Sequence, residues 1–410
     1  MKGSFYKRGN TWSYMLDVGT DPITGKRKQK SKGGFKTKKE AQAFAATILS
    51  EMNSGTYLEE KKMTFEELSD LWFESYGKLG NPKKLGTIRI RDSERKRFLQ
   101  FFKKIIVSEI SHDQYQQALI TLKKGHMDDN GKTIIKGLAD NSVSGTHATG
   151  VMIFEYGVKI GAIKNNPAKG AFIPKETKTV KDLEENNELP KYLEKDELSR
   201  FLETAKNHGL EFDYEIFNTL AYTGLRVGEL CSLKENDLNF EEDKIRITKT
   251  VYNPTNRYNL YSVHTPKTKA SIREIDVDPE VMLNLKDLLL QHGFEKKRKQ
   301  NKYHDEGFVF ARTGEYAGYP LVIKIVNNRM KRLLKLAKLN PDLSPHSLRH
   351  THVSLLAEAG ASLEQIMQRL GHSNDEITRR IYLHITKPKR KEAAQKFSEL
   401  MKASKKPDDC

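Results

Sequence analysis

The sequence predicts a multidomain fold that is mainly α-helical and carries small β-sheets. Its 410 residues exceed one typical domain, so two or three domains are expected. Apolar residues recur at helical spacing through most of the chain, whereas β-like runs occur at the N-terminus and near 245–277. The charged stretch from Ile173 to Leu189, which is followed by Pro190, is typical of a linker. The expected parts are an N-terminal module (1–58), a helical domain (63–172), the linker (173–189), a mixed α+β domain (190–385) and a basic tail (386–410).

The balance of charges points to a polyanionic partner. The chain has 71 Lys and Arg residues against 54 Asp and Glu residues, a formal net charge of +17 and a pI near 9.4, which favours nucleic acid. A membrane surface is the competing polyanion, but the sequence has no run of about 18 apolar residues and no basic amphipathic anchor. The N-terminal stretch has no apolar signal core, so a cytoplasmic location is expected.

The N-terminal module is expected to be a three-stranded meander followed by a helix. Its strands are predicted at Ser4–Lys7, Thr11–Val18 and Lys26–Ser31, and Thr37 with Glu40 forms a capping box that begins the helix. The first 40 residues hold eleven Lys and Arg against three acidic residues. This charge density predicts DNA contact, and a merely solubilising basic cap is the alternative. The candidates for DNA contact here are Lys26, Arg27, Lys28 and Lys30.

Residues 63–172 are predicted to be all-helical. Capping boxes at Thr64 with Glu67 and at Ser111 with Gln114 each precede an apolar stripe, and a longer helix is expected from Asn141 to Ile160. Between the two boxes lies a basic helix. Helices with basic faces can wrap a DNA duplex, although such faces are also commonly just solvated. The candidates for DNA contact on the basic helix are Arg89, Arg91 and Arg95.

Helices and short strands are expected to mix in residues 190–385. One helix is predicted near Ile216 and ends at Thr223-Gly224. Ser344 is a good N-cap and Pro345 suits the first helical position, so another helix should run from there to Gly360. A further helix is expected over 198–205, and strands over 245–251 and 271–277.

Two arginines in this part lie where a neighbouring side chain can act with them. Arg226 follows a glycine break, and Glu229 lies three residues on, where it can orient the guanidinium if the segment is helical. His346 and Arg349 are also three residues apart on a predicted helix, so they share a face and can converge on one target. A permanently charged, planar guanidinium suits a phosphate.

Lys267, in a turn beside Pro266, joins this set together with His372 and Tyr382. Two arginines can grip the nonbridging oxygens of one phosphodiester and stabilise the charge that develops during displacement. Lys267 can protonate a leaving 5′ oxygen, His346 can exchange a proton with the nucleophile, and Tyr382 can attack phosphorus. A covalent phosphotyrosine conserves the bond energy, so strands are rejoined without ATP, and neither a metal nor a cofactor is needed.

Five short motifs occur in the order TGLRVGEL, TPKTKAS, HSLRHTH, LGH and IYLH. In this order they resemble the tyrosine recombinase (phage integrase) family over essentially its whole catalytic domain. Lys269 lies two residues from Lys267, so that assignment depends on the length of the family's hairpin. The catalytic positions implied by the resemblance are Arg226, Lys267, His346, Arg349, His372 and the nucleophile Tyr382, with Glu229 as the supporting acid.

The resemblance also implies an activity and its partners. The family cuts and rejoins DNA through a 3′-phosphotyrosyl intermediate and a Holliday junction, as a homotetramer on double-stranded attachment sites, and exchanges a C-terminal segment between protomers. Residues 63–172 resemble its core-binding domain, and 1–58 resemble the arm-site-binding domain of integrases from phages and integrative conjugative elements. Whether the tail docks in cis or on a neighbour, and whether an excisionase or a host DNA-bending protein takes part, stays open.

Three alternatives remain. A type IB-like topoisomerase would relax supercoils by the same tyrosine chemistry, but the N-terminal module and the motif spacing disfavour it. A non-catalytic DNA-binding regulator would explain the charge without Tyr382. The sequence has only two cysteines, Cys231 and Cys410, which lie far apart, so neither a disulfide framework nor a Cys-ligated zinc site is expected. A zinc hydrolase lacks the HExxH spacing, although it could draw on His346, His350, His352 and His372.

Overall fold

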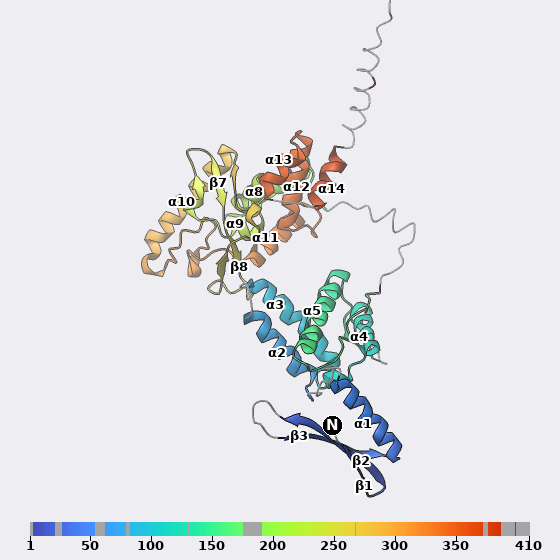
Figure 1. Ribbon diagram of the computed structural model, residues 1–410. Coiled ribbons are helices and arrows are strands. Elements are labelled where there is room, and N and C mark those ends of the chain that lie inside the picture. Colours follow the sequence, from blue (N-terminus) through green and yellow to red (C-terminus); the bar gives the residue numbers. More distant parts are fainter. Residues whose placement is uncertain are drawn as a thin grey trace, which may run out of the picture. The chain divides into compact units, whose positions relative to one another are not determined.

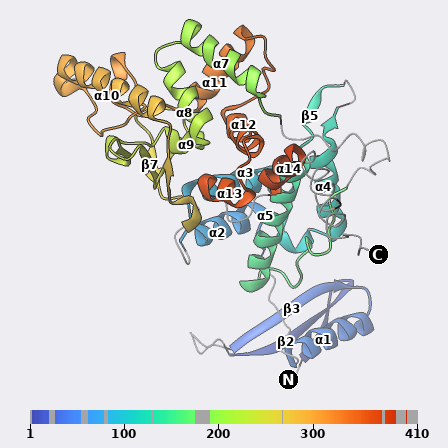
Figure 2. The same ribbon diagram turned by 90° about the horizontal axis from the view of Figure 1, so that it is seen from above.

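The computed structural model describes residues 3–20, 27–53, 62–78, 83–128, 131–174, 191–266, 268–371, 376–386 and residue 398. The chain divides into two compact units, Met1–Thr177 and Lys178–Cys410, which are taken separately here (Figures 1 and 2). Most of the predicted linker, 173–189, and most of the predicted tail, 386–410, lie outside the described residues. No helix within the described ranges is long and apolar enough to cross a membrane.

A β-meander and one helix form the N-terminal module, as the sequence predicts. The strands are antiparallel in the order β1-β2-β3, and Tyr14 and Leu16 of the central strand are buried against Ala45 and Ile48 of the helix (Figure 1). The capping box begins that helix, because the Glu40 N–H donates to Thr37 Oγ1 over 3.2 Å. The elements are β1 (Gly3–Arg8), β2 (Thr11–Thr20), β3 (Arg27–Phe35) and α1 (Lys38–Asn53).

Residues 62–174 pack helices around an aromatic core. Phe65, Phe98, Tyr115 and Phe154 come from different helices, and each is fully buried. The Ser111–Gln114 capping box is complete, with the Gln114 N–H donating to Ser111 Oγ over 3.2 Å. The helices are α2 (Phe65–Lys78), α3 (Leu85–Phe102), η1 (Val107–Glu109), α4 (His112–Lys124) and α5 (Asp140–Lys159).

The all-helical prediction for this part is wrong between α4 and α5, where a short hairpin is formed by β4 (His126–Met127) and β5 (Thr133–Ile135). Gly125 ends α4 with a φ of 84° that continues no helix. Asp128 then closes the turn, since its carboxylate accepts the Lys132 N–H over 2.7 Å. Local turn chemistry therefore overrides the helical pattern here.

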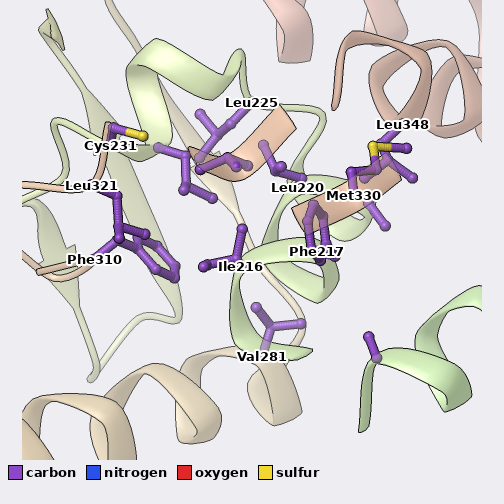
Figure 3. Packing of buried hydrophobic residues seen from close by; sticks show 14 of the residues in the cluster. Ile216, Phe217, Leu220, Leu225, Cys231, Val281, Phe310, Leu321, Met330 and Leu348 are labelled. Atoms are coloured by element: carbon purple, nitrogen blue, oxygen red, sulfur yellow. The ribbon is translucent and has the colours of Figure 1, made fainter. Parts of the chain in front are cut away.

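The second unit surrounds its largest apolar core with helices. Figure 3 shows Phe217 and Leu220 of α8 beside Met330 of α11 and Leu348 of α12, with Val281 of α10 in the same cluster. Each of these side chains is almost fully buried, so the core fixes the helices that carry the candidate residues. The α-helices are α7 (Lys195–His208), α8 (Asp213–Thr223), α9 (Val227–Leu230), α10 (Pro279–Lys299), α11 (Ile323–Leu336), α12 (Pro345–Glu358), α13 (Leu363–Leu370) and α14 (Glu376–Ile385). Short 3-10 helices are η2 (Glu235–Asp237), η3 (Lys269–Ser271), η4 (Gln300–Lys302) and η5 (Gly314–Tyr316).

Two small antiparallel sheets lie in this unit. The strand predicted over 245–251 is in fact two strands in different sheets, because the Lys249 carbonyl accepts the Ser232 hydroxyl over 3.0 Å and is turned away from the ladder. The strand predicted from Ser271 begins two residues later, after a turn in which the Ser271 N–H donates to Thr268 O. One sheet has the order β10 (Arg273–Asp276), β7 (Lys244–Ile247), β6 (Leu238–Asn239), and the other pairs β8 (Thr250–Tyr252) with β9 (Ser262–His264).

Candidate active site

The corner between α8 and α9 carries the first arginine. Gly224 ends α8 in the left-handed conformation, with a φ of 64°, and a Cβ there would lie 2.8 Å from the ring of His352. Arg226 then caps α9. Its Nη1 donates to Glu229 Oε1 over 2.8 Å and its backbone N–H donates to Oε2 over 3.0 Å, so the pairing predicted from the three-residue spacing is present. The Arg226 side chain keeps 36% exposure and is accessible to a ligand.

Glu229 is almost completely buried and has a second arginine partner that the sequence did not reveal. Arg273 of β10 donates from Nη2 to Glu229 Oε2 over 3.0 Å. Burial raises the pKa of Glu229, but the charge and hydrogen bonds of Arg273, together with those of Arg226, outweigh it and hold that pKa below its ordinary value. Glu229 is therefore a buried carboxylate that two guanidinium groups keep ionised.

The second motif arginine, Arg349, lies in the interior of the unit with 1% of its surface exposed. Its Nη1 donates to the carbonyl of Gly224 over 2.6 Å, and its Nη2 donates to that of Leu370 over 2.7 Å. One buried guanidinium thus joins the end of α8 to the end of α13. His346 is instead exposed and meets the ring of His350 edge to face at 4.8 Å, so the expectation that His346 and Arg349 face one target is met only in part.

A second buried cluster lies on the same helices and was not singled out as a site by the sequence. His352 Nδ1 bonds to the carbonyl of Ala221 over 2.8 Å, and its Nε2 accepts from Arg369 Nε over 3.0 Å. Because an arginine only donates, Nε2 must be the unprotonated nitrogen and Nδ1 the donor. Burial, followed by the charge of Arg369, lowers the pKa of His352 to about 3. The neutral imidazole of His352 therefore holds the guanidinium of Arg369 through its Nε.

Tyr382 is half-buried on α14. It packs with Ile381 and Ile385 against an apolar cluster that includes Val353 of α12 and Leu370 of α13. Figure 1 shows α12, α13 and α14 grouped together, and α14 contacts both of the other helices. The tyrosine is thereby held against the helix that carries Arg349 in the same chain.

Lys267 and His372 lie outside the described residues. The described residues beside them approach each other closely: an ideal Cβ on Gly371 would lie 2.8 Å from the carbonyl oxygen of Ala270. On the other side of the turn, the Thr268 and Ser271 hydroxyls are 2.9 Å apart. The end of α13 and the segment before β10 therefore lie in contact.

Two candidate DNA contacts on α3 have internal partners instead. Arg95 is 8% exposed and its guanidinium binds Asp70 of α2 and Asp92. Arg91 Nη1 donates to Glu94 over 2.8 Å and to Thr149 of α5 over 2.9 Å. These contacts hold the helices together and give Arg91 and Arg95 a structural role, and a DNA contact by either one stays a prediction. Arg89 is exposed and stays a candidate.

The structure describes the side chains of two of the four N-terminal candidates. Arg27 is exposed at the start of β3 and pairs with Asp17 of β2, with Nη2 to Oδ2 at 2.6 Å. Lys30 is half-buried on the same strand. Lys26 and the side chain of Lys28 lie outside the described part of the chain. None of these placements argues against a contact with DNA.

Comparison with known sequences decides the family. Residues 191–389 match the sequence model of the phage integrase family, and residues 4–52 match that of an arm DNA-binding domain. The chain belongs to the phage integrase family. It is a tyrosine-type site-specific recombinase, and the motif order that predicted this from sequence is confirmed at the level of the family.

Relatives of this recombinase come from phages and from an integrative element. It is 30% identical to the integrase of Staphylococcus phage L54a over 238 residues, which are 56% of this chain and 66% of that protein. It is 26% identical to the ICEBs1 integrase of Bacillus subtilis strain 168 over 406 residues, 96% of this chain and 99% of that one. A Tn1549 transposon integrase fragment, solved with a circular intermediate DNA, matches in fold with a TM-score of 0.59 and 20% identity, covering 82% of this chain and 99% of the fragment.

Proposed function

We propose that this recombinase integrates and excises a mobile element by cutting DNA at attachment sites through a 3′-phosphotyrosyl intermediate and exchanging strands through a Holliday junction. The observation that carries the proposal is the convergence of three separate segments on Arg349. That arginine binds the corner that presents Arg226 and the end of the helix that precedes His372, and α14 with Tyr382 packs on its own helix. The corner that presents Arg226 and the helix that carries Tyr382 are thus both held to α12 in one chain, which supports the proposal.

Arg226 and Arg349 supply the two guanidinium groups that grip the scissile phosphate, and Tyr382 is the nucleophile. Arg226 is oriented by Glu229 and exposed enough to meet a phosphate. The paired positive charges stabilise the additional negative charge that builds up as the tyrosine oxygen attacks phosphorus and the 5′ oxygen leaves. The bond to phosphorus formed by Tyr382 replaces the one that breaks, so the reaction reverses without an external energy source.

Protons have to move at both ends of this displacement. Lys267 donates one to the leaving 5′ oxygen, while His346 and His372 exchange a proton with the tyrosine and hydrogen-bond the phosphate. His346 is exposed, as a residue that meets DNA must be. The scheme as proposed uses no metal.

The partners follow from the separate parts of the chain. Residues 1–58 bind arm sites, whereas 63–172 and the catalytic unit bind the core site where cutting occurs. The functional assembly is a homotetramer on two double-stranded sites, with the C-terminal tail exchanged between protomers. An excisionase and a host DNA-bending protein are possible accessory partners, to be tested by adding each to the reaction.

The proposal is tested by the substitution Tyr382→Phe, which removes the attacking oxygen and little else. On nicked attachment-site DNA, the wild type should form a covalent complex that survives denaturing electrophoresis, and Tyr382→Phe should form none while its gel-shift affinity stays unchanged. Tyr214→Phe, at a half-buried tyrosine of α8, is the matched control and should react normally. Covalent attachment by Tyr382→Phe would remove Tyr382 from its role.

Two further measurements on the wild type, relaxation of a plasmid and cleavage of DNA strands, separate the rival activities. Relaxation of supercoiled plasmid that lacks any attachment site would favour a type IB-like topoisomerase. Binding without any strand cleavage by the wild type would favour a non-catalytic regulator. Cleavage confined to the attachment site supports the recombinase.

A further inference from the structure

Arg273 lies outside the sequence motifs, yet it is among the most enclosed arginines near the site. Its side chain is 5% exposed and comes from β10, the edge strand of the three-stranded sheet. It reaches both oxygens of Glu229, with Nη2 3.0 Å from Oε2 and Nη1 3.4 Å from Oε1. Arg226 binds the same carboxylate, so one buried acid is shared between an exposed and a buried guanidinium.

The remaining donors of Arg273 are directed to backbone. Its Nε donates to the carbonyl of Arg369 over 2.8 Å, and its Nη1 donates to that of Ser271 over 3.2 Å. The next carbonyl along α13, that of Leu370, accepts from Arg349. Two consecutive carbonyls at the end of α13 therefore bind two different arginines, one from the sheet and one from α12.

These contacts make Arg273 the link between the Arg226 corner and the end of α13. Without it, Glu229 would be a nearly buried carboxylate held by Arg226 alone, through its partly exposed guanidinium and its backbone N–H, and Oε2 would lose its charged partner. The Glu229 side chain would then be less firmly held and would orient the Arg226 guanidinium less well. A lysine could restore the charge but could not bond to Glu229 and to Arg369 O in the same fixed geometry, because its ammonium is a point charge on a flexible stem.

We propose that Arg273 is a positioning residue for DNA cleavage: it holds Glu229 so that Arg226 stays aligned on the scissile phosphate, and it joins that corner to the end of α13. Arg273 touches neither DNA nor the reacting atoms and acts through Arg226. This inference rests on the proposed function, since it requires that Arg226 grips a phosphate that Tyr382 attacks.

The first test compares Arg273→Met with Arg273→Lys in the full-length chain. With protein in excess over nicked core-site DNA, Arg273→Met should slow single-turnover cleavage by about 100-fold, the effect of displacing a catalytic group by roughly 1 Å, while the Kd for the site stays unchanged. Arg273→Lys should recover part of the rate. Wild-type cleavage by Arg273→Met, or a loss of DNA affinity that accounts for the whole defect, would overturn the proposal.

Arg329→Met is the matched control. Arg329 also binds a buried carboxylate of the same unit, with Nη1 3.1 Å from Oδ1 of Asp213, a residue whose side chain is 0% exposed. Its removal should lower the melting temperature and leave the cleavage rate unchanged. If Arg329→Met and Arg273→Met slow cleavage equally at equal loss of melting temperature, Arg273 is only structural and the proposal fails.

A double-mutant cycle tests whether Arg273 acts through Arg226. Arg226→Ala combined with Arg273→Met should cleave no more slowly than Arg226→Ala alone, because the positioned group is already gone. If the rate losses of the two single variants multiply in the double variant, Arg273 acts independently of Arg226, which would contradict the assignment. If Arg273→Met does not fold, Arg273→Lys enters the same cycle with the same expected outcomes.

A change in the substrate provides a second check that fold stability does not affect. In a core site with methylphosphonate at the scissile position, one charged nonbridging oxygen is replaced by a methyl group, so there is less charge to grip. The wild-type to Arg273→Met rate ratio should fall on this substrate, and an unchanged ratio would overturn the proposal. Failure of the wild type to form the tyrosine adduct on an ordinary phosphodiester core site would instead contradict the proposed function itself.

Discussion

Arginine side chains in this recombinase do different work according to how deeply they are buried. Arg226 is accessible to a ligand, whereas Arg349, Arg273 and Arg369 donate hydrogen bonds to carbonyls of distant segments. Carbonyls at helix ends have no partner within their own helix. A buried guanidinium with five donors in a plane can satisfy several of them at once. The site is thus built on arginines that hold backbone, and on the proposed mechanism Arg349 both holds backbone and grips phosphate.

The sequence predicted the residues that belong to local motifs and missed those whose partners are far away. Arg226 and Glu229 are three residues apart, and that spacing alone predicted their contact. Arg273 is 44 residues from Glu229, and His352 is 131 residues from Ala221, whose carbonyl it binds. No periodicity connects positions so distant, so only the folded chain shows that these side chains support the site.

His352 makes the stability of the catalytic unit depend on pH. Its pKa in the folded state is about 3, whereas the unfolded state should have the ordinary value of about 6.5. Between these values the unfolded chain binds more protons, so acid lowers the free energy of unfolding as the pH falls below about 6.5. One such group contributes about 2 kcal/mol of loss between about pH 7.5 and pH 5. Urea unfolding of wild type and His352→Asn at the two pH values should give a smaller loss for the variant.

The exposed His208 supplies the control for this measurement. His208→Asn should keep the wild-type dependence of unfolding on pH. A wild-type dependence in His352→Asn would mean that another group is responsible for the acid sensitivity.

At the scale of elements, helix starts were the most predictable feature. The capping boxes at Thr64 and at Ser111 place the first turns of α2 and α4 where they were expected, because each box satisfies backbone N–H groups within four residues of sequence. The divided strand near Lys249 and the hairpin β4–β5 were missed. Both depend on bonds that compete with the regular pattern, one to Ser232 and one to Asp128.

The junction between α13 and the segment before β10 depends on a glycine. Gly371 has a φ of 69°, and a Cβ would lie 2.8 Å from the carbonyl oxygen of Ala270 and 3.0 Å from Cδ of Arg273. Gly371→Ala should therefore cost about 2 kcal/mol or more, combining left-handed strain with displacement of backbone. The substitution should also slow cleavage, because the added methyl group displaces the Arg273 side chain. Thermal melts and single-turnover cleavage measure the two effects.

Gly314→Ala is the matched control for that substitution. Gly314 has a φ of 71°, and a Cβ there would meet nothing within 4 Å. It should therefore show only the left-handed strain, about 1 kcal/mol, with no change in cleavage rate. Equal losses in the two variants would show that the contact with Ala270 and Arg273 is unimportant.

At the scale of the whole molecule, each part has its own apolar core. The N-terminal module, the helical part and the catalytic unit bury separate clusters with no shared residue. The three domains expected from the sequence stay a prediction, since the chain divides into two compact units. Their exact boundaries stay a prediction where they fall in residues 54–61 and 175–190, which lie outside the described part of the chain.

Separate cores allow the arm-binding role to be tested by deletion. Removing residues 1–58 should leave the other two cores intact, so cleavage of a core site should continue while binding to a separate arm site is lost. Gel shifts with arm and core duplexes, at one fixed salt concentration, measure both. Unchanged affinity of the shortened chain for arm DNA would contradict an arm-binding role for the N-terminal module.

The separation of the site along the chain also orders events during synthesis. Arg349 bonds to a carbonyl 125 residues earlier, and Tyr382 follows it on a later helix. Chains emerge from their N-terminus, and domains fold as their residues become available. A polypeptide interrupted before α14 contains Arg226 and Arg349 but lacks Tyr382, the proposed nucleophile. On the proposed mechanism such a fragment can hold DNA but cannot cut it, so the ability to cut appears only when the last described helix has been made.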